Sequence, residues 1–340
     1  MTQRTTPSSD ASALASWDTI PQESLASLME PPKSVVGRPL FWVRKVLSHR
    51  SYNEWTWAYL FMIPSLAFFT LFTLYPVVRS ILLSLNRVNA YYDAPRFIGL
   101  YNYGKILRDD IWWAALKNTA LFTGATVPVL VALSLLLAVL IRPFGSKMQA
   151  LFRGIFYLPG VTSVVVISLI WLWIYYPFKQ GMANYLIGLF DIKPQLWLGD
   201  PSTALPAIIF MVWMTGQGAM VVLYGAALNN IPTSLYEAAD LDCASGWSKF
   251  RNITWPLIKP TTLYVIVIGT IGSFQVFDIV YTMTSGGPGY STRTLVFQIY
   301  QEGFRQYNFG YASAQAMILA LIIVVVAVFQ FRYLSTDVEY

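Results

Sequence analysis

The segment formed by residues 234–246 carries side chains suited to contact another protein, because it is polar and lies between two long apolar runs. Ser234 and Glu237 have the spacing of a capping box, in which each side chain accepts a hydrogen bond from a free backbone N–H. Pro232 stops the preceding helix from continuing, and Gly246 is suited to end the new one. Three alanines have small side chains that allow a partner to pack closely: Ala238, Ala239 and Ala244. A capped loop helix without a partner is the alternative, since capping boxes are common.

Small and polar residues interrupt two of the apolar runs and indicate a path for a polar solute. They are Trp213, Thr215, Gly216, Gln217 and Gly218 in the fourth run, and Gly269, Gly272, Ser273, Gln275 and Asp278 in the fifth. The amides of Gln217 and Gln275 both donate and accept hydrogen bonds, which suits hydroxyl-rich ligands. Helical spacing predicts one face in each run that lines the path. These faces are formed by Trp213, Gly216, Gln217 and Met220, and by Gly272, Gln275 and Ile279. Helix packing is the alternative, because small residues allow close approach and amides bond between helices.

Composition argues against enzymatic chemistry. The chain has one cysteine and one histidine, so we expect neither an internal disulfide nor a metal site nor a hydrolytic triad. The sequence contains no GxxxxGK[ST] motif for nucleotide phosphates. A membrane-embedded transferase would need catalytic acids, and the adjacent pair Asp109–Asp110 is instead expected to start a short helix before the second span. We therefore expect a chain that is not an enzyme and has no ATPase site.

Six long runs without charge predict the fold. Charged residues make up 12% of the chain and hydrophobic residues 56%. A spanning helix needs about 20 apolar residues, and at this length only helices satisfy their own backbone hydrogen bonds in lipid. The chain is therefore predicted to be an all-α membrane protein with six transmembrane helices. The runs are 55–78, 118–141, 154–178, 201–236, 260–277 and 306–331. The fifth run is short, but it can continue past Asp278 through residues 279–283 if Asp278 faces protein or water.

Residues 1–50 differ from the rest of the chain. They are rich in Ser and Thr and lack the apolar run of a signal peptide. We expect a largely disordered cytoplasmic extension, with a basic segment at residues 40–47 lying in the membrane interface. Residues 51–340 then form the six-span domain.

The distribution of basic residues predicts the orientation. Basic side chains precede the first run and crowd the short loop 142–153, and such loops face the cytoplasm. The longer loop 79–117 also carries six basic residues, which argues in the other direction. Charge density in the shortest loop favours cytoplasmic termini. Loops 142–153 and 229–260 are then inside, and loops 79–117, 179–204 and 284–305 are outside.

Several motifs together resemble one family. The order Glu237-Ala238-Ala239, a small residue at position 243 and then Ile253-Thr254-Trp255-Pro256 resembles the EAA signature of importer-type ABC transporter permeases. The carbohydrate-import members, of the maltose and glycerol-3-phosphate type, are similar over roughly residues 55–335. The other matching segments are Phe97–Tyr103, Asn118-Thr119, Arg153–Pro159, Trp171, Thr284–Pro288 and Phe309–Ala314.

The resemblance implies a coupling helix that docks in a cleft of a cytosolic ATPase subunit. It places five residues at this coupling surface: Glu237, Ala238, Ala239, Asp242 and Gly246. The family usually has Gly where this chain has Cys243. A β-carbon and a thiol at this position hinder unusual backbone angles and add bulk. The turn geometry and the closeness of docking are therefore where the chain can differ from the family, while docking itself is expected to survive because Cys is small.

The resemblance also implies the partners and the path. The partners are a second homologous permease subunit, two ATP-binding cassette subunits that bind ATP and Mg, an extracytoplasmic sugar-binding protein and membrane lipid, with no nucleic acid. The location is the bacterial inner membrane. The family's sugar-contact positions correspond to Thr215, Gly216, Ala219, Gly272, Ser273 and Val276. Because several of these residues are small or apolar, the chain is expected either to hold a sugar or polyol or only to line its path.

Two observations bear on the substrate and on the alternative. No basic residue lies in the middle of any run, which favours a neutral sugar or polyol over a phosphate ester. An ion-coupled secondary transporter of a small polar solute is the alternative function. Such a transporter normally has carboxylates within the membrane, and Asp278 is the one residue that fits this requirement.

Overall fold

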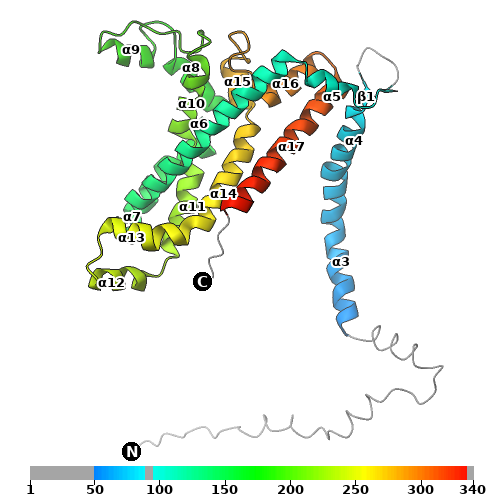
Figure 1. Ribbon diagram of the computed structural model, residues 1–340. Helices are drawn as coiled ribbons and strands as arrows, with labels where there is room; N and C mark the ends of the chain where they lie inside the picture. The colour runs from blue at the N-terminus through cyan, green and yellow to red at the C-terminus, as the bar shows by residue number, and fades with distance from the viewer. Residues whose placement is uncertain (1–49, 89–94, 335–340) are drawn as a thin grey trace, which may run out of the picture. The chain divides into compact units, whose positions relative to one another are not determined.

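The computed structural model describes residues 50–88 and 95–334 (Figure 1). These residues belong to two units, 1–76 and 77–340, which are described separately. The expectations for the extension 1–50 fall almost wholly outside the described residues and stay predictions.

The first predicted span begins in the first unit and ends in the second. Helix α3 (Arg50–Phe69) passes through a π-turn, η1 (Thr70–Leu74), into α4 (Tyr75–Ser84). The apolar stretch Thr56–Ser84 is 29 residues long, and none of its most apolar window is buried inside the chain. Lipid or another subunit must therefore cover these side chains.

The described part of the second unit contains helices and a two-stranded ladder. Strand β1 (Asn86–Arg87) pairs antiparallel with β2 (Arg96–Phe97), and Asn86 lies opposite Phe97. The first helices are α5 (Tyr101–Ile106), α6 (Asp110–Ile141), α7 (Ser146–Val161), α8 (Val164–Ile174), α9 (Met182–Gly188), α10 (Ala204–Thr215) and α11 (Gly218–Asn229). They are followed by α12 (Thr233–Leu241), α13 (Gly246–Lys249), the π-turn η2 (Phe250–Thr254), α14 (Trp255–Phe274), α15 (Asp278–Met283), α16 (Leu295–Tyr300), the π-turn η3 (Gln301–Arg305) and α17 (Phe309–Leu334).

The membrane-spanning character of the fold is confirmed, with a correction to the shape of two spans. Four helices in the described ranges are long and apolar enough to cross a membrane, and two bent pairs bring the number to six if each pair is one span. The run 154–178 is divided into α7 and α8, which differ in direction by 94°. The run 201–236 is divided into α10 and α11, which differ by 40°. Prediction of single continuous helices was therefore wrong for these two runs.

The start of the fifth span is also corrected. The run was predicted to begin at residue 260, yet the helix is continuous from Gly246 to Phe274, over 29 residues, and includes Pro256 and Pro260. Pro256 lies inside this continuous helix, two residues after the last residue of η2 (Phe250–Thr254). The π-turn η2 directly precedes α14. Helices accommodate irregular turns of this kind without ending.

The end of the fifth span differs from the prediction as well. The sequence allowed the helix to continue past Asp278, but α14 ends at Phe274 and Asp278 opens the separate helix α15. The residues between them leave the helical path, and Phe277 has φ −137°. The acidic side chain thus lies at a helix start, where the positive end of the helix dipole favours it.

Asp109 caps the second span rather than starting a short helix before it. Its side chain accepts hydrogen bonds from the backbone N–H groups of Ile111 and Trp112, at the start of the 32-residue helix α6. The hydroxyl of Tyr311, in α17, donates to the second carboxylate oxygen of Asp109 at 2.6 Å. The prediction for this pair was wrong because the helix extends into the charged segment before residue 118.

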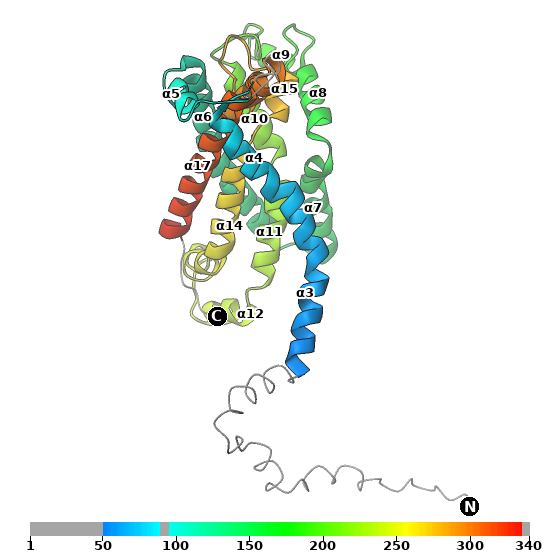
Figure 2. The ribbon, with the colours of Figure 1, turned by 90° about the vertical axis from the view of Figure 1, so that its right-hand side faces the viewer.

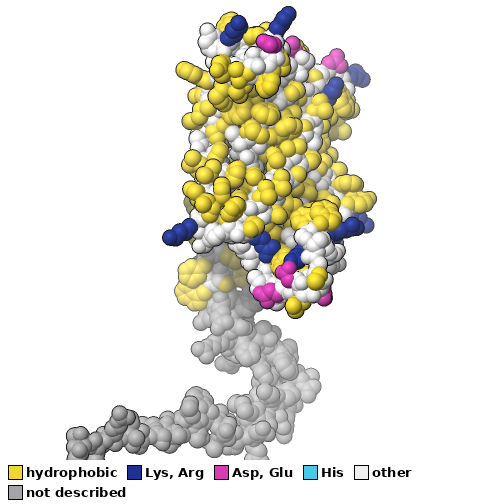
Figure 3. Space-filling model, turned by 90° about the vertical axis from the view of Figure 1, so that its left-hand side faces the viewer, with side chains coloured by type: hydrophobic (Ala, Val, Ile, Leu, Met, Phe, Trp, Pro, Cys, Tyr) yellow, Lys and Arg dark blue, Asp and Glu magenta, His cyan; other side chains and the backbone are white. Residues whose placement is uncertain are grey.

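The second unit has the surface of a membrane protein. Figure 3 shows a band of hydrophobic side chains with charged side chains gathered at the two ends. Figures 1 and 2 place α12 at one end of this unit and α9 and α15 at the other. The predicted loop 142–153 is mostly helix, because α7 begins at Ser146.

Candidate coupling helix and translocation path

Helix α12 contains the predicted coupling residues, but its amino end is not built as a capping box. The helix begins at Thr233, and Pro232 is the residue that precedes it, with ψ 131° and no side-chain capping bond. Ser234 is already inside the first turn, so its backbone is helical and its side chain cannot act as the cap. The extended backbone of Pro232 sets the entry into the helix instead.

The carboxyl end of α12 is a Schellman turn. Cys243 has φ +53°, and its N–H donates to the carbonyl of Asp240 at 3.0 Å. The N–H of Ala244 donates to the carbonyl of Ala239 at 2.9 Å. This pair of bonds defines the motif. The usual family glycine therefore corresponds to a left-handed residue, and Cys243 adopts that conformation despite its β-carbon.

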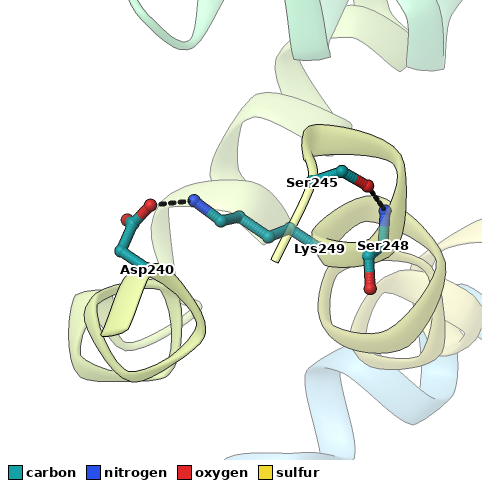
Figure 4. A network of polar contacts seen from close by, with 4 residues as sticks. All are labelled: Asp240, Ser245, Ser248 and Lys249. Carbon is teal, nitrogen blue, oxygen red and sulfur yellow. Dashed lines mark hydrogen bonds and ion pairs between the residues drawn. The ribbon is translucent and has the colours of Figure 1, made fainter. Parts of the chain in front are cut away.

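Gly246 does not end α12, which corrects the expectation from sequence. It opens the next helix, α13, whose cap is Ser245. The Ser245 hydroxyl accepts a hydrogen bond from the N–H of Ser248 at 3.2 Å (Figure 4). The Schellman turn at Cys243 had already ended the preceding helix, so no terminating glycine is needed.

The predicted coupling residues lie on an open surface. Glu237, Ala238, Asp242 and Gly246 are exposed, and Ala239 is half-buried. Next to them Leu241 is 87% exposed.

The opposite side of α12 is tied to the helices beneath it. The hydroxyl of Tyr236 shares a 2.8 Å hydrogen bond with that of Thr254, in η2. The guanidinium of Arg142 lies 4.3 Å from the centre of the Tyr236 ring. An ion pair joins Asp240 to Lys249 (Figure 4). Sequence reasoning missed all of these contacts, because they join positions far apart along the chain.

The predicted path residues of the fourth span lie at the break between α10 and α11. Thr215 ends α10, and its hydroxyl donates to the carbonyl of Met211 at 2.8 Å. Gln217 is only 9% exposed; its Nε2 donates to the carbonyl of Met214 at 3.1 Å. The Gln217 Oε1 atom is buried and has no hydrogen-bond partner among the described residues. Gly216 and Ala219 are exposed.

The predicted path residues of the fifth span lie at the end of α14. Gly272 and Gln275 are exposed, whereas Ser273 lies 3.3 Å from the hydroxyl of Thr126. Val276 is buried, and its carbonyl accepts a hydrogen bond from the Thr294 hydroxyl at 3.0 Å. At this end of the predicted path, Val276 therefore contributes a backbone hydrogen bond while its side chain is buried.

The two helical faces predicted from spacing are wrong, because each crosses a break. The helix is interrupted between Gly216 and Met220 and again between Gln275 and Ile279. The breaks nevertheless border the same apolar cluster, which contains Met211 and Val276 with Trp213 and Ile279 packed against it. The indole Nε1 of Trp213 donates to the carbonyl of Ala125 at 3.1 Å, which ties this cluster to α6.

A groove beside α11 contains a basic residue that sequence reasoning did not assign. Its volume is about 630 Å³, and its lining includes Ala219 and Arg153. A β-carbon on Gly225 would lie 3.2 Å from the Arg153 guanidinium carbon, so the side chain packs closely on α11. Because α7 starts before Arg153, the lack of basic residues in run 154–178 no longer argues for a neutral substrate. The signal in the sequence was the position of Arg153 directly before that run.

Two family motifs meet at the opposite end. Asn118 Nδ2 donates to the carbonyls of Tyr290 and Arg293, at 2.7 and 3.0 Å. Thr119 accepts a hydrogen bond from the N–H of Leu295 at 2.9 Å. The Asn-Thr pair in α6 thus holds the loop between α15 and α16 in place. Burial lowers the pKa of the Arg293 guanidinium in this loop.

Comparison with known proteins identifies the family. Residues 122–339 match the family described as binding-protein-dependent transport system inner membrane component. The lactose transport system permease protein LacF of Rhizobium radiobacter is 35% identical over 266 residues, covering 77% of this chain and 87% of LacF. The chain belongs to the binding-protein-dependent transport permeases. As a transport permease of the inner membrane it is not an enzyme, and the family resemblance is confirmed.

Further comparisons agree with this assignment. The arabinooligosaccharides transport system permease protein AraP of Bacillus subtilis is 31% identical over 289 residues, covering 84% of this chain and 91% of AraP. A chain of a bacterial ABC transporter that imports the acidic polysaccharide alginate has a TM-score of 0.72 at 22% identity. The match covers 86% of this permease and 100% of that chain. At this identity the structural likeness supports the fold.

Proposed function

We propose that this permease translocates a sugar or related polyol, delivered by an external binding protein and driven by two ATP-binding cassette subunits. The partners further include a second homologous permease subunit. ATP and Mg are bound by the cassette subunits, and this chain contributes no nucleotide site. Relatives named for lactose and arabinooligosaccharides support the substrate class.

The open face of α12 is the observation that carries the proposal. Glu237, Ala238, Asp242 and Gly246 are exposed together at one end of the unit, where a cytosolic subunit can reach them. This end is then cytoplasmic, and both termini are cytoplasmic as well. The substrate passes the breaks at the ends of α10 and α14, next to Thr215, Gly216, Gln217, Ala219, Gly272, Ser273, Gln275 and Val276. The secondary-transporter alternative is abandoned, because the family imports through binding proteins and Asp278 is exposed at a helix start.

Charge reversal on α12 tests the proposal. Glu237→Lys should abolish uptake and co-purification of the ATPase subunits, while the permease stays inserted in the membrane. The side chain is exposed and makes no capping bond, so reversal changes the docking surface rather than the fold. Lys147→Glu reverses an exposed charge in the first turn of α7 and is the matched control. Uptake by Glu237→Lys at the wild-type rate would contradict the coupling role of α12.

A further inference from the structure

Tyr236 connects α12 to the fifth span. Its hydroxyl shares a hydrogen bond with Thr254, which is only 5% exposed and ends the π-turn η2. Its ring packs on the apolar cluster that includes Ile231 and Ile258. A shift of α12 therefore acts directly on the helix that leads to the path residues near Gln275.

Tyr236 also connects α12 to the end of the second span. Arg142 follows the last residue of α6, and its guanidinium lies 4.3 Å from the Tyr236 ring centre. The Arg142 carbonyl accepts a hydrogen bond from Gln149 Nε2 at 2.9 Å. Gln149 Oε1 in turn accepts one from Arg153 at 3.1 Å. Arg153 lines the groove beside Ala219, so this series of contacts runs from α12 to the predicted path.

The second attachment of α12 is weaker. Asp240 pairs with Lys249 near the carboxyl end of the helix (Figure 4). The Lys249 side chain is 20% exposed, but the Asp240 side chain is 67% exposed, and water around the carboxylate screens the pair. The Tyr236 ring and the Arg142 side chain are half-buried, which makes a cation–π contact stronger. The contact at Tyr236 therefore dominates the attachment.

We propose that Arg142 and Tyr236 form a clamp that transmits movement of α12 to the second, third and fifth spans. The clamp rests on the proposed coupling role of α12. Without it, the nine-residue helix would tilt within its two flanking loops when an ATPase subunit moves. Both residues are positioning residues, since neither touches the exposed docking face or the path.

Reconstitution of the complete transporter in proteoliposomes tests the clamp, with substrate uptake and ATP hydrolysis measured together. Arg142→Gln and Tyr236→Leu should each lower uptake per ATP hydrolysed by roughly three- to tenfold, the factor expected for a half-buried cation–π contact. ATPase subunits should co-purify in wild-type amounts. Tyr236→Leu breaks the contact with Arg142 and also removes the hydrogen bond to Thr254. The double variant should therefore be no worse than Tyr236→Leu alone, because Arg142→Gln breaks a contact that this variant has already lost.

Two controls separate transmission from stability. Arg142→Lys keeps a cation over the ring and should restore most of the uptake per ATP. Arg251→Gln removes an exposed charge from η2 and should leave the ratio unchanged. The clamp is disproved by an unchanged ratio, by additive effects in the double variant, or by loss of the ATPase subunits from the single variants. Failure of the ATPase subunits to co-purify with the wild-type chain would instead overturn the proposed function.

Discussion

Cys243 occupies a backbone conformation that normally belongs to glycine. Its φ of +53° costs a residue with a β-carbon about 1–2 kcal/mol, and the two bonds of the Schellman turn offset this cost. The departure from the family glycine was visible in the sequence, and it correctly marked the turn. What the sequence could not show is that the chain keeps the glycine geometry rather than avoiding it.

Cys243→Gly should therefore stabilise the end of the coupling helix. Removal of the β-carbon strain is worth about 1 kcal/mol. Amide hydrogen exchange at residues 243 and 244 should slow by about fivefold, because this free energy sets the local opening equilibrium. Cys243→Ala keeps the β-carbon and should show no slowing. Equal exchange in the Gly and Ala variants would contradict the strain argument.

The two glutamines of the predicted path differ in their surroundings. Replacement of each by Leu should therefore affect uptake at both positions but stability at only one. Gln275 is exposed, so Gln275→Leu should impair uptake while membrane levels stay normal. Gln217 is buried, and its Oε1 has no hydrogen-bond partner within the described part of the chain. Its replacement also removes the 3.1 Å bond to Met214, and should impair uptake with a small loss of stability, about 1 kcal/mol.

Uptake assays and quantitative membrane blots distinguish these effects. Leu is matched in size to the amide, so a change in uptake without a change in protein level reports on polarity. Normal uptake in both variants would remove these residues from the path.

The helices show why run lengths predict spans but not their bends. Charge-free runs located the membrane-spanning segments, because a charged side chain is costly in lipid. Whether a segment can lie in lipid therefore depends mainly on its composition. The breaks after Val161 and Thr215 depend on which backbones pack together. Gly218 is an example: a β-carbon there would lie 2.2 Å from the carbonyl oxygen of Phe156. Contacts of this kind join residues distant in sequence and leave no periodic signal.

Gly218→Ala should therefore weaken the packing of α7 on α11. The clash is with backbone, which cannot move aside locally, and overpacking of this kind costs about 1–3 kcal/mol. The midpoint of thermal unfolding in detergent should fall. Gly124→Ala is the matched control, since a β-carbon there meets nothing within 4 Å. A Gly218→Ala protein as stable as the Gly124→Ala protein would show that the two helices do not pack as described.

On the scale of the whole molecule, the motifs predicted the family while the structure supplied the connections between them. The EAA segment, the Asn-Thr pair and the Gly-Gly-Pro turn each matched the family in sequence. Only the structure shows that Asn118 and Thr119 hold the loop that follows this turn, at one end of the unit. The contact of Tyr236 with Arg142 joins the EAA helix to the α6–α7 turn at the other end. The basic residues of loop 79–117 and those of loop 142–153 favour opposite orientations. Counting charges does not resolve this conflict, because the count does not use the position of α12.

The single cysteine allows the side of the membrane that carries α12 to be determined by labelling. Cys243 is exposed, and the chain has no other cysteine. A membrane-impermeant maleimide should label it in inside-out vesicles and not in intact spheroplasts, since the proposed orientation places α12 in the cytoplasm. Bound ATPase subunits should reduce labelling, because Cys243 adjoins the docking face. Tyr290→Cys in a Cys243→Ser background is the matched probe from the other end, where Tyr290 is 48% exposed, and it should react in intact spheroplasts. Labelling of Cys243 from outside would reverse the topology and exclude contact between α12 and a cytosolic ATPase.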